Sequence, residues 1–98
     1  MSNEKFETWE DLKKELNISS EQQAEIKLEV ELIQAAIDAR KNANLTQREL
    51  SEMSGIKQPN IAKIENLKRS PRAITLIKML VPLGYTLKVV PLNKNMEN

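Results

Sequence analysis

Apolar residues recur every three or four positions along most of the chain, which is the spacing of helices with one buried face. The pattern predicts a short helix over residues 6–16, a long helix from Ser20 to about Asn42, and three shorter helices over 47–54, 58–67 and 73–83. The apolar side chains of the three shorter helices that are expected to face the core are Leu50, Met53, Ile61, Ile64, Ile74, Ile77, Leu80 and Val81. Ile56 is expected to be buried with them.

Polar residues and glycine mark the ends of these helices. Ser20 with Gln23 and Thr46 with Glu49 have the spacing of capping boxes, in which two side chains bind unpaired N–H groups at a helix start. Gly55 is expected to end the 47–54 helix, because glycine adopts a left-handed conformation without strain. The sequence therefore predicts two short helices on either side of a tight turn.

The segment Tyr85–Leu92 is rich in β-branched and aromatic residues and predicts one strand. A lone strand leaves its backbone donors and acceptors unpaired, which proteins avoid. We therefore predict that it pairs with the same strand of a second copy across a two-fold axis, through Tyr85, Leu87 and Val89. The alternative is an extended tail that packs on the helices without pairing.

Composition limits the chemistry that the chain can perform. The 98 residues include no histidine, no cysteine and only two glycines, so neither a catalytic or metal centre nor a glycine-rich phosphate loop nor a cofactor is expected. No apolar run is long enough to span a membrane, and the N-terminus is too acidic for a signal peptide. A small cytoplasmic protein that is not an enzyme is expected.

Charge divides the chain into two unequal halves. Residues 1–38 contain ten acids and four bases, whereas residues 39–98 contain eleven bases and four acids. A basic half suits DNA phosphates, and an acidic half suits a basic protein. The alternative is that both halves are simply solvated surfaces. The first half also has apolar residues on more than one helix side, which indicates a second contact surface. The residues expected to bind this partner are Phe6, Trp9, Leu12, Leu16 and Ile26; for Phe6 and Trp9 the alternative is packing on the long helix.

Two short helices joined through Gly55 fit the physical description of a helix-turn-helix, whose second helix enters the major groove of DNA. The segments Thr46–Ser51 and Ile64–Asn66, with Gly55, Gln58 and Ile61 between them, resemble the Cro/C1-type (XRE) helix-turn-helix family in register. The resemblance covers roughly residues 32–84. It implies an all-α fold, a five-helix bundle that binds DNA operators as a dimer.

The resemblance also implies roles for polar residues. Gln47 would bind a phosphate, Gln58 would face the bases, and Asn60 and Lys63 would lie on the outward side of the second helix. These residue types fit independently, because Gln and Asn match adenine edges while Lys and Arg neutralise phosphates. The predicted DNA-binding residues are Gln47, Arg48, Lys57, Gln58, Asn60, Lys63, Lys68, Arg69 and Arg72. The alternative for Gln58, Asn60 and Lys63 is that they are solvated polar residues. Arg40, Lys41 and Lys78 are interpreted as surface charges.

Three positions depart from the family pattern. Ser51 stands where an alanine is usual, and it is still small enough for close helix packing. Lys57 stands where a serine often caps the second helix, so a cap is lost and a cation is added. Leu67 stands where a glycine often follows Glu65 and Asn66. The second helix is therefore expected to run longer or to end less cleanly than in the family.

The layout of the whole chain is similar to antitoxins of the HigA type, and its strand resembles that of HipB-type antitoxins. This resemblance implies an acidic partner-binding extension over 1–30, a DNA-binding domain over 31–84 and a dimerisation strand over 85–98. The leading hypothesis is an antitoxin that neutralises a basic RelE/HigB-like ribonuclease and represses its own operon as a homodimer. The alternatives are a stand-alone XRE repressor, of phage or restriction-controller type, and a protein-interaction module without DNA affinity.

Overall fold

The computed structural model describes residues 19–92 of the chain. Its helices are α2 (Ser20–Asn42), α3 (Gln47–Ser54), α4 (Gln58–Glu65) and α5 (Ala73–Leu80), followed by the short 3-10 helix η1 (Val81–Leu83). The expected all-α class is confirmed. The expected five-helix bundle is not, because residues 19–92 contain four α-helices and one short 3-10 helix. The helix predicted over 6–16, with Phe6, Trp9, Leu12 and Leu16, lies outside the described residues.

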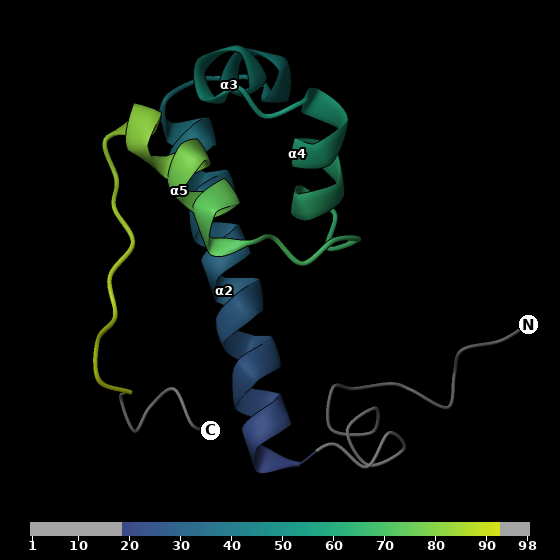
Figure 1. The fold of residues 1–98 in the computed structure, drawn as a ribbon, viewed down its shortest axis with the longest axis vertical. Coiled ribbons are helices and arrows are strands. Elements are labelled where there is room, and N and C mark those ends of the chain that lie inside the picture. The colour runs from purple at the N-terminus through teal and green to yellow at the C-terminus, as the bar shows by residue number, and fades with distance from the viewer. Residues whose placement is uncertain (1–18, 93–98) are drawn as a thin grey trace, which may run out of the picture.

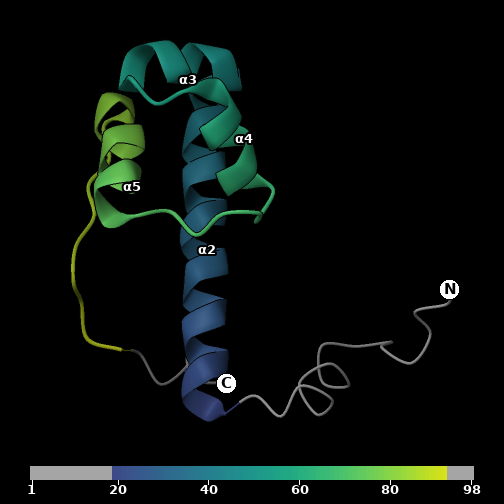
Figure 2. The same cartoon turned by 45° about the vertical axis from the view of Figure 1, so that its right-hand side comes forward.

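The C-terminal half of α2 forms the centre of the bundle. α4 and α5 pack against it, and α3 lies across the end at which α2 finishes (Figures 1 and 2). The N-terminal half of α2 continues beyond the other helices, and we call residues 20–31 the α2 extension. α2 is continuous from Ser20 to Asn42, so the helix runs unbroken through the domain boundary predicted at residue 30. Within residues 19–92, no helix is long and apolar enough to cross a membrane.

One cluster of buried apolar side chains joins the four α-helices. Its members are Ile33, Ala36, Ala39, Leu50, Ile56, Ile61, Ile64, Leu76, Met79 and Leu80. Burial of apolar surface is the dominant stabilising term in folding, so this cluster fixes how α3 and α4 sit on α2. The predicted burial of Leu50, Ile56, Ile61, Ile64 and Leu80 is confirmed.

Four other side chains that were expected in the core are exposed, and these predictions are wrong. The exposed fractions are 50% for Met53, 48% for Ile74, 37% for Ile77 and 59% for Val81. Nearly every residue of α5 is apolar, so its sequence pattern does not select one face. The structure buries Leu76 and Met79 of this helix instead.

The helix starts follow the capping logic, with one shift. The Thr46 hydroxyl accepts from the Glu49 N–H at 3.0 Å, and the Glu49 carboxylate accepts from the Thr46 N–H at 2.8 Å, so this capping box is confirmed. At α2 the box consists of Ser19 and Gln22 rather than Ser20 and Gln23, so that prediction is wrong by one residue. Ser19 acts as the cap because its own backbone is extended, whereas Ser20 is already the first residue of the helix.

The helix ends show how the departures from the family pattern are accommodated. α4 stops at Glu65 instead of Leu67, and Leu67 itself adopts a left-handed φ of 61°. The Lys68 N–H donates to the Lys63 carbonyl at 2.8 Å and the Leu67 N–H to the Ile64 carbonyl at 3.0 Å, which is the Schellman pattern that usually contains glycine. α5 stops at Leu80, because Pro82 has no N–H to continue an α-helix, and Gly84 closes η1 at a φ of 89°.

Residues 85–92 leave η1 as an extended segment that runs back toward the N-terminal end of α2 (Figures 1 and 2). No strand is formed within residues 19–92, so the predicted strand is not confirmed in the single chain. Leu87 packs against the core cluster, whereas Tyr85 is 50% exposed and Val89 is fully exposed.

Candidate nucleic-acid interface

The turn between α3 and α4 is fixed by short-range contacts. Gly55 ends α3 with a left-handed φ of 77°, as predicted. Ile56 is buried beneath the turn, its N–H donates to the Ser54 hydroxyl at 3.2 Å, and its carbonyl accepts from the Ser51 hydroxyl at 2.5 Å. α4 therefore begins at a defined position beside α3, with Lys57 in the capping position and no side-chain cap, as expected from the sequence.

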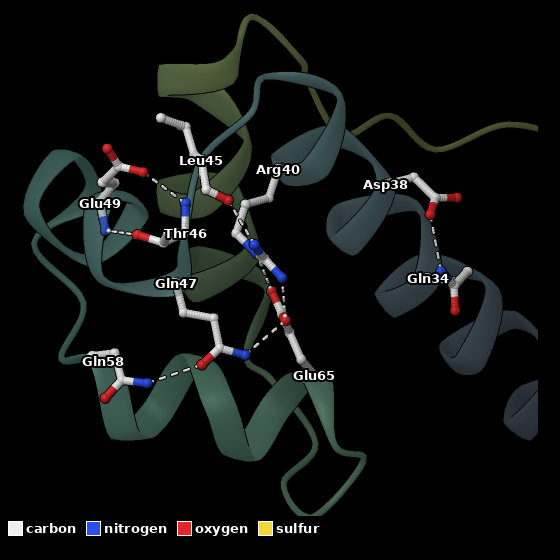
Figure 3. Close-up of polar contacts among 9 residues, drawn as sticks. All are labelled: Gln34, Asp38, Arg40, Leu45, Thr46, Gln47, Glu49, Gln58 and Glu65. Carbon is white, nitrogen blue, oxygen red and sulfur yellow. Dashed lines mark hydrogen bonds and ion pairs between the residues drawn. The ribbon is translucent and has the colours of Figure 1, made fainter.

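A chain of side-chain hydrogen bonds links the start of α4 to the centre of the bundle (Figure 3). The Gln58 amide nitrogen donates to the Gln47 carbonyl oxygen at 2.9 Å, and the Gln47 amide nitrogen donates to Glu65 at 2.9 Å. Glu65 accepts from Arg40 at 2.8 and 2.9 Å. Arg40 also donates to the Leu45 carbonyl at 2.6 Å, just before the start of α3.

The Arg40–Glu65 ion pair anchors this chain, since the two side chains are only 10% and 7% exposed. Burial raises the pKa of Glu65, but the hydrogen bonds from Arg40 and Gln47 outweigh it, so the pKa lies below its ordinary value of 4.5. The hydrogen bond with Glu65 raises the pKa of Arg40. Both groups are therefore charged at neutral pH, in the two-pronged geometry that makes Arg–carboxylate pairs strong.

The negative charge of Glu65 decides which side-chain atoms of Gln47 and Gln58 donate and which accept in this chain of hydrogen bonds. An ionised carboxylate only accepts, so the Gln47 amide nitrogen must turn toward Glu65 and its carbonyl toward Gln58. Gln58 must then present its amide nitrogen to Gln47. Gln58 is exposed at the first position of α4, and a glutamine amide held this way has the donor and acceptor that an adenine edge requires.

The other predicted DNA-binding residues are distributed around this edge. Asn60 is half-buried and accepts from Arg69 at 3.1 Å, so the loop after α4 is joined to the outward side of that helix. Arg48 is exposed on α3 and lies 4.0 Å from Glu52 of the same helix. The remaining cations are exposed just before α4, on it or in the loop that follows: Lys57, Lys63, Lys68 and Arg72.

An open pocket of about 440 Å³ adjoins this edge, between α4, the loop over 66–72 and α5. Its lining includes four cationic residues, Lys57, Arg69, Arg72 and Lys78. In residues 19–92 no group of three or more acidic side chains could hold a metal ion. The chemistry of this face is therefore that of amides and cations, which suits bases and phosphates.

Of the two groups at the base of the hydrogen-bonded chain, sequence reasoning gave Glu65 a structural role within the bundle, such as a salt bridge, but missed Arg40. The interpretation of Arg40 as a surface charge is wrong, because Arg40 is only 8% exposed and forms an ion pair with Glu65. These residues are 25 positions apart, so no helical spacing relates them. The one sequence signal is the position of Arg40 in the last turn of a helix whose C-terminal half was expected to pack on its own domain.

Comparisons with known proteins agree with this arrangement. A model of the helix-turn-helix family matches residues 37–90. An HTH-type transcriptional regulator of Haemophilus influenzae is 39% identical over 84 residues, which are 86% of this chain and 85% of the relative. A solved structure described as a toxin–antitoxin module from Streptococcus pneumoniae is similar with a TM-score of 0.66 at 41% identity, over 93% of this chain and 100% of that one.

Proposed function

The chain belongs to the XRE-type helix-turn-helix family, and we propose that it is the antitoxin of a toxin–antitoxin pair. In this role it binds a basic RelE/HigB-like ribonuclease in the cytoplasm and represses its own operon. One observation carries the proposal. The similarity to the S. pneumoniae toxin–antitoxin module extends over 93% of the chain at 41% identity, well beyond residues 37–90, which match the helix-turn-helix family model.

The α2 extension supports a basic protein as the partner. Four exposed acids lie along it: Glu21, Glu25, Glu29 and Glu31. Ile26 and Val30 are 40% and 42% exposed among these acids, one turn apart on the helix. With Lys27 as its one base, the α2 extension has a net charge of −3. Exposed apolar side chains on a surface of net negative charge suit a partner of opposite charge. We therefore assign residues 1–30, with Ile26 as their described apolar contact, to toxin binding.

The DNA-binding role is assigned to residues 31–84. Gln58, oriented through Gln47 and Glu65, is the base-reading side chain in this proposal, and the surrounding cations bind the backbone. The extended residues 85–92 then pair with a second copy, for which Tyr85 and Val89 are exposed. A homodimer of this kind binds two half-sites about 34 Å apart, one helical turn of DNA.

Co-expression with the product of the adjoining gene tests the antitoxin role. The antitoxin should relieve the growth arrest that its partner causes and should co-purify with it. The double substitution Ile26→Asp and Val30→Asp should abolish both effects while leaving operator binding intact. Met53→Asp is the control, because Met53 is also an exposed apolar residue, at 50%, but lies on α3. Unchanged co-purification of the double variant would refute the assignment of the α2 extension.

A stand-alone repressor is the second candidate, favoured by the similarity to a protein described only as a transcriptional regulator. Under that function the chain binds its operator, but no adjoining gene encodes a small basic protein that arrests growth. Failure of every neighbouring gene product to arrest growth would select the repressor over the antitoxin.

A further inference from the structure

The pocket between α4 and α5 has a cationic lining without an acidic member. Lys57 comes from the start of α4, Arg69 and Arg72 from the loop over 66–72, and Lys78 from the second turn of α5. The neutral polar side chains of the lining are Asn60, Ser70 and Thr75. One acid lies near the rim, since Glu29 accepts a hydrogen bond from the Ser70 hydroxyl.

Four like charges around one open pocket repel one another, and an anion among them removes that repulsion. The volume of about 440 Å³ is many times the roughly 30 Å³ that one water occupies in the liquid, so a phosphate group fits with its hydrating water. Lysine, arginine and neutral hydroxyl or amide groups are the side chains that proteins place around phosphate oxygens. The chemistry of the lining therefore selects a phosphate.

The position of the pocket indicates where that phosphate comes from. Lys57 and Asn60 line the pocket and also belong to the outward edge of α4 that is assigned to the DNA groove. A duplex that receives this edge brings its backbone close to the mouth of the pocket. We infer that the pocket accepts one backbone phosphate in each half-site, and that Lys78 binds DNA. This inference rests on the proposed DNA-binding function, and it adds a DNA contact to Lys78, which is exposed as the sequence predicted.

The substitution Lys78→Gln tests the inference, because it removes the charge from an exposed helical position and leaves the fold intact. Operator affinity is measured by fluorescence anisotropy between roughly 50 and 200 mM salt, with circular dichroism to confirm folding. The slope of log K against log salt is negative, and each lost phosphate contact reduces its magnitude by about 0.9, hence by about 1.8 for a dimer on two half-sites. At roughly 100 mM salt this slope change corresponds to a loss of affinity of about 60-fold.

Lys27→Gln is the control for the loss of one positive charge, because Lys27 lies on the α2 extension and does not line the pocket, so the slope should stay unchanged. A Lys78→Gln slope equal to that of the unsubstituted protein overturns the inference. Absence of any operator preference or salt dependence in the unsubstituted protein would instead refute the proposed function itself.

Free anions are the other source of a phosphate group. Inorganic phosphate is therefore titrated into the isotope-labelled protein without DNA, and amide chemical shifts of the pocket residues are followed. Saturable shifts at millimolar phosphate that vanish in Lys78→Gln, together with an unchanged DNA slope, would assign the pocket to a free anion and overturn the DNA assignment.

Discussion

Replacing Glu65 by Gln tests the ion pair that positions Gln47 and Gln58. The substitution removes the negative charge, but the Arg40 guanidinium stays charged in a site where its side chain is 10% exposed. Removing one partner of a buried ion pair costs about 3–5 kcal/mol, and the residual exposure places this pair at the low end, about 3 kcal/mol. A small domain has about 5–15 kcal/mol of stability in total, so the effect is large.

A double variant separates the unpaired charge from the lost hydrogen bonds. Arg40→Met with Glu65→Gln removes the stranded cation and keeps an acceptor for Gln47, so it should be about 2 kcal/mol more stable than Glu65→Gln alone. Urea unfolding followed by circular dichroism at fixed protein concentration measures both. Glu52→Gln is the control, since Glu52 is 70% exposed and should cost less than about 0.5 kcal/mol. A double variant no more stable than the single one would refute the reasoning.

Three further predictions concern stability. Leu67→Gly should raise the free energy of unfolding by about 0.5–1 kcal/mol, because Leu67 has a left-handed φ of 61°; a lower urea midpoint would contradict this. Thr46→Ala should lower the free energy of unfolding by about 1 kcal/mol, because the cap of α3 is lost. An unchanged midpoint of urea unfolding would refute the capping role. The folded pKa of Glu65 lies below 4.5, so its contribution is complete above pH 4.5 and is lost as pH falls through the lower folded pKa. Glu65→Gln should accordingly flatten the dependence of stability on pH below 4.5, and parallel curves would show that Glu65 does not titrate this way.

The parts of the fold that were predicted correctly depend on local chemistry. The capping box of Thr46 and Glu49 and the left-handed Gly55 involve residues within a few positions of each other, so a sequence pattern specifies them. The expectation that α4 runs to Leu67 or beyond is wrong. The helix ends at Glu65, because Leu67 itself adopts the left-handed conformation that glycine usually takes there.

The parts that sequence could not supply depend on distant contacts. In α5 the apolar residues surround the helix, and only the positions of α2 and α3 decide that Leu76 and Met79 face inward. The Arg40–Glu65 pair joins α2 to α4 and is visible only once the helices are packed. For residues 85–92 the amino-acid pattern predicts a strand, but a strand needs a neighbour that a single chain does not provide.

The central claim is that the edge of α4 beginning at Gln58 selects a DNA sequence. The most direct measurement compares affinity for the promoter of the chain's own gene with affinity for a scrambled duplex of equal length. Gln58→Ala should lower the ratio of these affinities by about tenfold or more, whereas Lys68→Ala should weaken both bindings and preserve the ratio. An unchanged ratio in a correctly folded Gln58→Ala protein would contradict the account.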